Sequence, residues 1–531
     1  MKSKKKMKLK KYYLHPITVF LLLTIIVVIL SGILSNLQMQ GTYNSITTAG
    51  KNLNAKLLSV ENLFSFAGMR YIISNALKNF ISFSPLSMLL ISLIGISVAE
   101  STGFIEAFSK RYFKKMSKWK LTFIVIFIAT ISSLINGIGY ALLIPLVALI
   151  YFIIGRNPIL GIVTAFCGVA FGYGVSIFIG STEISLMDYT RNAAMLVDQS
   201  THIALSSNLF FIILSTIVIS IIGTIIIEKL VSPKIGKYKK EEEFSKTEQY
   251  RIIDFEEEEQ KKIEKEIREK KGLRAALVTT IIVLLLFAYM LIPNLPSSGM
   301  LLDMNEKIYL NQLFGEKSYF QDGFSYMVAM ILILAGLAYG IKSKSIKSDK
   351  ELIKNIDEKF STIGSVILLL FVISTFLSVW KQTNIGSILT IWLVNLLEQL
   401  KLSGIPLIII TLLLIAVSNI FLTGTEAKWS IFAPVVVPMF MQSNISPQFA
   451  QIVMRVGDSM TNGITPFLAS FAIYLGYLNL YNLNKKRPYT IRKSIKILMQ
   501  YFIIINLVWI VLVVGWYIIG LPIGPGVFPT I

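Results

Sequence analysis

Two short stretches, IFIGSTE at residues 177–183 and IFLTGTE at residues 420–426, lie in opposite halves of the chain. Aligned without gaps, they are identical at four of seven positions, and a fifth position pairs Ile179 with Leu422. Each is an apolar strip that ends in glycine and hydroxyl residues followed by a glutamate. Glycine allows a backbone to leave a helix, so the stretches predict matched helix breaks in two related halves. The alternative is a chance match, because Ile and Phe are common in this chain.

Composition indicates that these breaks lie in a membrane protein. Of the 531 residues, 54% are hydrophobic and 15% are charged, whereas soluble domains carry about 25% charged residues. The mean hydropathy is +0.67. A bilayer span needs about 20 apolar residues, and several of the apolar runs are long enough. The runs occupy residues 17–35, 86–105, 121–153, 158–180, 205–227, 275–293, 324–341, 362–380, 386–400, 405–422, 429–442, 466–484 and 496–519.

The basic residues mark one side of a membrane rather than a surface for nucleic acid. The net charge is +21, and Lys/Arg clusters stand between apolar runs at 110–120, 229–274, 342–354 and 485–493. Cytoplasmic loops are enriched in these residues, so we expect a lipid bilayer around the chain, no nucleic-acid partner and a cytoplasmic N-terminus. The first apolar run is too long for a signal peptide. If successive spans cross the membrane in alternating directions, the first three basic clusters all lie in the cytoplasm only when residues 158–180 do not cross fully. We therefore expect a re-entrant hairpin at 158–180.

Two polar segments interrupt the apolar runs. Residues 36–84 are expected outside the cytoplasm, and residues 228–274 mix Glu and Lys at spacings typical of a solvated helix. The second segment separates the two halves. We therefore divide the chain into N-terminal spans with an extracytoplasmic segment (1–120), a first transport repeat with a hairpin (121–227), a charged cytoplasmic linker (228–274), scaffold spans (275–380) and a second transport repeat with a hairpin and the C-terminal span (381–531).

Charged residues in apolar surroundings are the functional candidates, because a charge at bilayer depth is costly. They are Glu100, Glu183, Asp188, Arg191, Glu398, Glu426, Lys428, Arg455 and Asp458. Arg455 and Asp458 lie one helical turn apart, and Asn462 continues that face. Arg455 presents a planar fork of donors suited to a substrate carboxylate, and the alternative is an internal Arg455–Asp458 pair. Trp429 either stacks on an aromatic ligand or anchors its helix at the membrane interface.

The acids that end the two matched stretches are candidates for binding a coupling ion. Glu183 and Glu426 could ligate a cation with neighbouring hydroxyl oxygens or could carry a proton, and the alternative is a hairpin tip that contacts water. We assign cation or proton coupling to Glu183, Asp458, Thr182 and Thr425. A candidate sodium site comprises Gly180, Ser181, Thr182, Gly424 and Thr425.

An intramembrane enzyme and an ATP-driven pump are disfavoured. Such an enzyme needs a positioned base or a metal, but the sequence has no metal-ligand cluster, and its histidines, His15 and His202, lie at the edges of apolar runs. No GxxxxGK(S/T) nucleotide loop is present, and the single cysteine, Cys167, is expected to be a small packed residue. The sequence predicts a secondary active transporter without a cofactor, coupled to sodium or protons, with a channel as the alternative.

Several blocks resemble the p-aminobenzoyl-glutamate transporter family, the AbgT type. The most specific are AKW at 427–429, APVVVPMF at 433–440 and RVGDSMTNGITP at 455–466. Looser matches lie at 96–103, 157–161 and 165–172. The resemblance extends over nearly the whole chain.

This resemblance implies an all-α membrane fold of about nine transmembrane helices and two re-entrant hairpins, arranged as inverted repeats with scaffold and transport parts. It also implies a homodimer in the bacterial cytoplasmic membrane. The implied substrates are p-aminobenzoyl-glutamate, a folate breakdown product, or exported sulfonamide antifolates, moved by symport or antiport. A carrier for dicarboxylates, short-chain acids or peptides is the alternative. The family's substrate-binding positions fall on Trp429, Pro447, Arg455 and Asp458, to which we add Asn462 and Glu426.

Two positions depart from the family pattern. A hairpin acid that is usually Asp is Glu183 here, and a Ser that precedes Ala-Lys-Trp is Glu426. The second change adds a negative charge near the expected substrate-binding region, whereas p-aminobenzoyl-glutamate is itself a dianion. We hypothesise that Glu426 adds a cation or proton site, or shifts selection toward a less acidic ligand.

Overall fold

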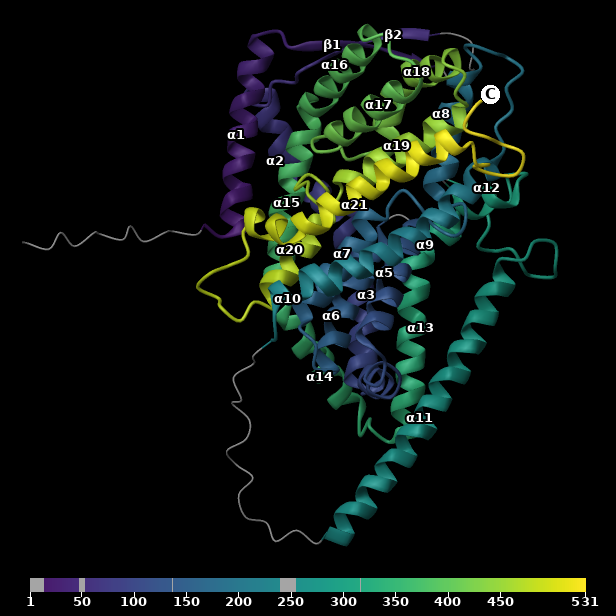
Figure 1. The fold of residues 1–531 in the computed structure, drawn as a ribbon. Helices are drawn as coiled ribbons and strands as arrows, with labels where there is room; N and C mark the ends of the chain where they lie inside the picture. The colour runs from purple at the N-terminus through teal and green to yellow at the C-terminus, as the bar shows by residue number, and fades with distance from the viewer. Residues whose placement is uncertain (1–13, 47–52, 136, 239–254, 316) are drawn as a thin grey trace, which may run out of the picture.

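The computed structural model describes residues 14–46, 53–135, 137–238, 255–315 and 317–531 and is almost entirely helical (Figure 1). The strands are β1 (Gln40–Ile46) and β2 (Leu53–Ser59). The helices are α1 (Pro16–Asn36), α2 (Phe66–Ile81), α3 (Ser84–Ser101), α4 (Phe104–Phe108), α5 (Lys118–Ile131), α6 (Ile138–Ile153), α7 (Pro158–Phe171), α8 (Ser181–Ala194), α9 (Leu209–Ile226), α10 (Ser232–Ile235), α11 (Phe255–Met290), α12 (Tyr309–Phe314), α13 (Tyr319–Ser343), α14 (Asp349–Thr362), α15 (Gly364–Gln382), α16 (Ile385–Gln399), α17 (Gly404–Ser418), α18 (Thr425–Gln442), α19 (Pro447–Thr461), α20 (Phe471–Leu480) and α21 (Ile491–Ile519).

Seven helical segments within the described ranges are long and apolar enough to cross a membrane. They are α1, the joined α2–α3 segment, the segment of α9 and α10, most of α11, and α13, α15 and α21. Shorter apolar helices accompany them. The predicted helical, multi-pass membrane fold is therefore confirmed.

Each half of the chain contains a pair of consecutive shorter helices. α6 packs on α7 across the short connection 154–157, and α16 packs on α17 across 400–403. These helices have 14 to 16 residues, which gives about 21–24 Å at a rise of about 1.5 Å per residue. The hydrocarbon core of a bilayer is about 30 Å thick, so none of the four helices reaches across it.

The apolar run at 121–153 is two helices rather than one. α5 ends at Ile131, a 3₁₀ turn covers Ser132–Leu134, and α6 begins after Gly137, whose φ of +79° favours glycine. Arg156, just after α6, donates to Thr122 near the start of α5 at 3.2 Å, so the break turns α6 back toward the end at which α5 begins. The chain then runs without helix through 172–180 into α8.

The same order of elements recurs in the second half. α15 precedes the α16–α17 pair, a nonhelical stretch at 419–424 follows, and α18 comes next. The two matched stretches, 177–183 and 420–426, thus each lead from an apolar helix through a nonhelical connection into a new helix.

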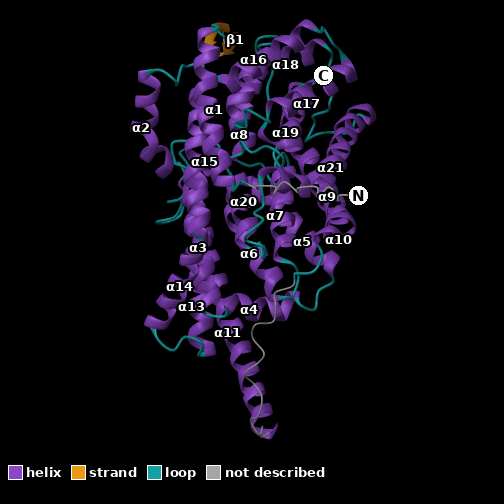
Figure 2. Cartoon of the chain, turned by 90° about the vertical axis from the view of Figure 1, so that its left-hand side faces the viewer, coloured by secondary structure: helices purple, strands orange, loops and turns teal. Residues whose placement is uncertain are grey.

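The fold has a compact end and an extended end. β1 and β2 pair antiparallel, with Gln40 opposite Ser59, and lie near α16 and α18 at one end (Figure 1). α11 packs on α13 and α13 on α3, and the first turns of α11 project beyond the other helices at the opposite end (Figure 2). The expected charged helix is present in its C-terminal part, where α11 runs without interruption past residue 274. Residues 1–13 and 239–254 lie outside the described ranges, and the division into domains stays a prediction.

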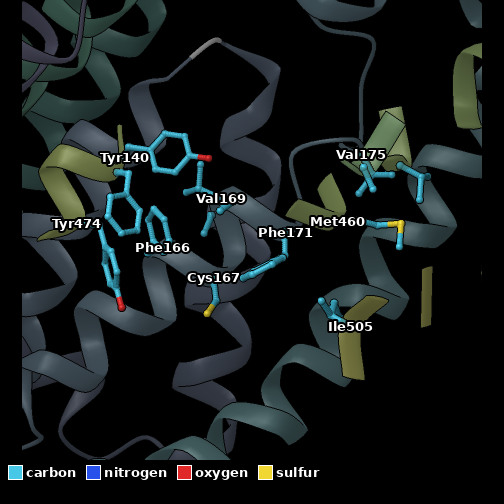
Figure 3. Close-up of a cluster of buried hydrophobic side chains, with 14 of the residues drawn as sticks. Tyr140, Phe166, Cys167, Val169, Phe171, Val175, Met460, Tyr474 and Ile505 are labelled. Carbon is cyan, nitrogen blue, oxygen red and sulfur yellow. The ribbon is translucent and has the colours of Figure 1, made fainter. Parts of the chain in front are cut away.

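Aromatic packing joins the first hairpin to α20. The rings of Phe166 and Tyr474 stack with centroids 4.1 Å apart, and Tyr140 lies on the other side of Phe166 at 5.8 Å (Figure 3). Cys167 is fully buried beside them, as expected for a small packed residue. These contacts hold α6, α7 and α20 together as one packed unit.

Candidate functional site

Helix α19 is the centre of the candidate site because every one of its residues is buried. It nevertheless carries polar side chains on one face, spaced three or four residues apart. These are Gln451, Arg455, Asp458 and Ser459, and Asn462 follows directly after the helix. Buried polar and charged groups are costly without partners, so neighbouring elements must supply them.

The start of α8 supplies the partner of Arg455. Arg455 Nε donates to Glu183 Oε1 at 2.9 Å, and both side chains are at most 8% exposed. Glu183 Oε2 accepts from the amide of Gln451 at 3.0 Å. Arg455 Nη2 donates to the carbonyl of Tyr173 at 2.9 Å, and the guanidinium lies 5.0 Å from the Tyr173 ring centroid. The alternative of an internal Arg455–Asp458 pair is therefore wrong.

Trp429 belongs to the same network through Thr190. The indole Nε1 donates to Thr190 Oγ1 at 2.9 Å, and that hydroxyl lies 2.9 Å from Gln451 Oε1. Trp429 is fully buried, so it is a core residue and not an anchor at the interface. In this conformation its ring has no open face for a ligand.

The start of α18 supplies the partners of Asp458. Lys428 Nζ forms an ion pair with Asp458 Oδ1 and donates to Asn419 Oδ1 at 2.6 Å. Thr425 Oγ1 donates to Asp458 Oδ2 at 2.7 Å. The amide of Asn419 donates in turn to Asn462 Oδ1 at 2.8 Å. Lys428 and Asp458 are 0% and 1% exposed, so this ion pair is isolated from solvent.

The nonhelical stretch before α8 links the two ion pairs. The Tyr173 hydroxyl lies 3.4 Å from Thr425 Oγ1, while its carbonyl accepts from Arg455. The next residue, Gly174, donates its N–H to Ser459 Oγ at 2.6 Å. A Cβ at Gly174 would lie 2.5 Å from the Arg455 carbonyl oxygen, so only glycine allows this approach to α19.

The two glutamates of the matched stretches have different surroundings. α8 begins after Gly180, so Glu183 is its third residue, whereas α18 begins after Gly424, so Glu426 is its second. An offset of one residue turns a side chain by about 100° around a helix. Glu183 is consequently buried against α19, while Glu426 is exposed and lines a separate cavity.

The structure thus brings most of the predicted residues together. Glu183, Thr425, Trp429, Arg455, Asp458 and Asn462 lie in the two joined networks. Thr182 is buried near them and lines a small cavity with Arg455. Pro447 is eight residues before Arg455, about 12 Å along α19, and is the first residue of that helix. Glu100 lies at the end of α3, as expected, and pairs with Lys359.

Several participants have no assigned role in the sequence analysis, among them Lys428, Asn419 and Gln451. Lys428 appears there only as a charge in apolar context, and Asn419 and Gln451 are absent. Gln451 lies four residues before Arg455, so the helical spacing that relates Arg455 to Asp458 could have found it. Asn419 and Lys428 belong to other elements, and no spacing rule predicts their contacts with Asp458.

A small cavity of about 10 Å³ lies between α8, α19 and the turn after α5, with room for roughly one water molecule. Within the described part of the chain, Arg455 Nη1 is buried there without a hydrogen-bond partner. This free donor is available to an acceptor if the cavity widens. Among the described residues, no group of three His, Cys, Asp or Glu side chains could hold a metal ion.

A sequence profile described as the AbgT putative transporter family matches residues 9–531. The chain belongs to this family. Membership confirms a membrane transporter rather than an enzyme, as the sequence predicts. The AbgT resemblance of the sequence blocks is likewise confirmed over nearly the full chain.

Relatives of this AbgT chain come from several bacteria. The p-aminobenzoyl-glutamate transport protein of Escherichia coli (strain K12) is 28% identical over 522 residues, which cover 97% of this chain and 94% of that protein. The crystal structure of the Alcanivorax borkumensis YdaH transporter, described as having an unusual topology, is 27% identical, with a TM-score of 0.48 over 96% of this chain and all of that one. Neisseria gonorrhoeae MtrF, described with a class of antimetabolite efflux pumps, is 28% identical, with a TM-score of 0.48 over 97% of this chain and 98% of that one.

Proposed function

We propose that this AbgT-family chain is an ion-coupled secondary active transporter of small aromatic acyl-amino acids such as p-aminobenzoyl-glutamate, or an exporter of sulfonamide antifolates. The E. coli relative, a p-aminobenzoyl-glutamate transport protein, supports this substrate class. The observation that carries the proposal is the pair of buried ion pairs, Glu183–Arg455 and Lys428–Asp458, that join α19 to the two helix starts.

The charge balance of these pairs suggests how substrate and ion are coupled. In each pair the two charges neutralise each other. Separating a buried pair leaves an uncompensated charge, which costs about 3–5 kcal/mol of free energy. A substrate carboxylate that binds Arg455 would displace Glu183. The freed Glu183 carboxylate then needs a sodium ion or a proton, so the substrate binds best together with the coupling ion. Asp458, with Thr425, is the second candidate for that ion.

Substrate binding in this scheme requires α8 and α18 to move relative to α19. Trp429 is fully buried between these helices, and it would become available to stack on an aromatic ring only when they separate. Secondary transporters move one repeat or bundle against another around a fixed site. The glycines that precede both helices, Gly180 and Gly424, are where we expect the backbone to bend.

The decisive experiment reconstitutes the full chain in proteoliposomes with labelled p-aminobenzoyl-glutamate and, separately, a labelled sulfonamide. Sodium and proton gradients are imposed one at a time. We expect saturable flux that one of the gradients drives. Flux that does not saturate would indicate a channel, and absence of flux with either gradient would contradict the proposal. Dicarboxylates and short peptides as competitors test the alternative carrier function.

Two variants separate substrate binding from ion coupling. Glu183→Gln removes the negative charge that the substrate would displace from Arg455. We therefore expect flux to persist while its dependence on the sodium or proton gradient is lost. Arg455→Lys keeps the charge but loses the planar fork, so we expect a higher KM with the gradient dependence retained. Gradient dependence that survives Glu183→Gln would assign the coupling ion to another group.

Glu426 is tested separately because it lies outside the buried networks. We compare Glu426→Ser with the unchanged chain in uptake and efflux at several pH values. An altered pH profile or substrate range is expected if Glu426 contributes to ion or substrate selection. An unchanged profile and range would reject this role.

The remaining expectations concern assembly and sidedness. We propose a homodimer with the N-terminus in the cytoplasm, which places the β1–β2 end outside. Mass measurement in native nanodiscs tests the dimer. Labelling of an introduced cysteine at Glu61, which follows β2 and is exposed, tests the sidedness with an impermeant reagent.

A further inference from the structure

An apolar cavity of about 400 Å³ lies between two groups of helices. α11 packs on α13 and α4, whereas α5 packs on α7 and α9, and both groups line the cavity together with α6. Its only lining side chains with a polar atom, among the described residues, are Ser109, Tyr112 and Thr280. The interior therefore suits hydrocarbon and not p-aminobenzoyl-glutamate, whose two carboxylates would have no partner there.

The cavity opens to the outside of the protein. Several of its lining side chains are partly exposed, namely Phe108 at 37%, Tyr112 at 49%, Ile128 at 48% and Leu277 at 59%. Phe104, Phe108 and Tyr112 form a row along it, with successive ring centroids 5.9 and 4.8 Å apart. α11 is a candidate membrane span, so the medium next to this opening is lipid.

Basic residues gather at one end of the cavity. α5 begins at Lys118, and its lining residues follow at 121–128. On α11 the lining residues begin at Leu273, directly after Lys270 and Lys271. α4 packs against α11 near the end from which α11 projects (Figure 2). Both helices therefore reach the cavity from the same, basic end.

Most of these basic side chains have no acidic partner. Residues 104–120 include six Lys and Arg but only one acid, Glu106, which pairs with Lys110. Trp119, at 44% exposure, stands in this segment, and Trp is enriched at the level of lipid headgroups. Within the described ranges, no Asp or Glu oxygen lies within 4 Å of the other five basic side chains, all exposed: Arg111, Lys114, Lys115, Lys118 and Lys120.

We propose that this cavity seats an acyl chain of an anionic phospholipid, whose phosphate is bound by the basic residues of 110–120 and α11. Lipid chains are as apolar as Leu, so the preference for one lipid comes from its headgroup charge. Basic loops orient membrane proteins without any bound lipid, but the adjoining cavity adds a fixed position for one chain. The inference goes beyond the proposed transport function and does not depend on it.

The test compares two probes with the same chains, dioleoyl-phosphatidylglycerol and dioleoyl-phosphatidylcholine. Each is titrated into the purified full chain in detergent, and native mass spectrometry measures the lipid retained. A basic residue near an anionic surface strengthens binding about fivefold, so we expect phosphatidylglycerol to bind at least about fivefold more tightly. The difference should shrink as ammonium acetate is raised. Equal retention of both lipids would overturn the proposal, as would displacement of the lipid by glycerol phosphate, which has the phosphate but no chain.

Variants of the basic end test the headgroup contact. Arg111→Gln with Lys115→Gln should weaken phosphatidylglycerol binding about five- to thirty-fold and leave phosphatidylcholine binding unchanged. The matched control is Lys347→Gln with Lys350→Gln, which removes two exposed basic side chains that do not line the cavity. An equal loss in the two double variants would show a general effect of surface charge and would contradict the assignment.

Variants of the lining test the position of the chain. Leu277→Trp places a larger side chain in the cavity and should lower phosphatidylglycerol retention. Leu284→Trp is the matched control, because Leu284 lies two turns further along α11, is 50% exposed and does not line the cavity. Equal retention by the two variants would overturn the proposal. Retention by monomers but not by dimers would show that a second copy covers the cavity, and would also overturn it.

The lipid measurement is made without transport, so the two proposals can fail separately. Flux of p-aminobenzoyl-glutamate is measured in parallel in proteoliposomes. Flux without selective phosphatidylglycerol retention would reject only the lipid site, whereas selective retention without flux would reject only the transport function.

Discussion

Removing Lys428 should destabilise the protein more than removing any exposed charge. Its ammonium is 0% exposed, pairs with Asp458 at 1% exposure and also donates to Asn419. In Lys428→Met the apolar stem is retained, but among the described residues the Asp458 carboxylate keeps only the hydrogen bond from Thr425 at 2.7 Å. Breaking a buried pair from one side costs about 3–5 kcal/mol. We expect a loss of that size in the free energy of unfolding.

The double variant Lys428→Met with Asp458→Asn isolates the interaction between the two charges. It leaves no uncompensated charge, so we expect it to lie within about 2 kcal/mol of the unchanged chain, because replacing both members of a buried pair is often nearly neutral. The interaction free energy from the double-mutant cycle should then be at least about 2 kcal/mol.

Unfolding of the full chain by SDS in mixed micelles, followed by tryptophan fluorescence, measures these differences. Lys110→Met is the matched control, because Lys110 pairs with Glu106 while 53% exposed, and exposed pairs contribute about 0–1 kcal/mol. A loss below about 1 kcal/mol for Lys428→Met, or a double variant whose loss equals the sum of the single losses, would refute a buried charge pair.

Two further substitutions test the packing around α19. Gly174→Ala places a Cβ 2.5 Å from the Arg455 carbonyl oxygen and should cost about 1–3 kcal/mol by overpacking, measured in the same SDS titration. The control Gly364→Ala meets no atom within 4 Å and should be neutral, so equal losses would contradict the argument. Trp429→Phe removes the donor to Thr190 and should cost at least about 1 kcal/mol, and a stability unchanged in that titration would count against this hydrogen bond.

The class of protein and the position of the site follow from the sequence alone. Apolar runs of bilayer length leave no soluble alternative, and the helical period places Arg455, Asp458 and Asn462 on one face. Two echoing stretches identify the helix breaks, because glycine and hydroxyl residues in apolar surroundings are local features that need no knowledge of neighbours. Family-specific blocks such as 455–466 then indicate transport.

The partner of each charge was decided only by the tertiary structure. Arg455 and Asp458 could pair with each other by spacing, yet they pair with Glu183 and Lys428 from two different helices. Likewise, Glu183 and Glu426 are aligned in sequence, but α18 starts one residue later than α8 relative to that alignment. The packing of α8 buries Glu183 against α19, whereas the packing of α18 leaves Glu426 exposed. Periodicity fixes which residues share a helix face, whereas the packing of helices distant in sequence determines what that face contacts.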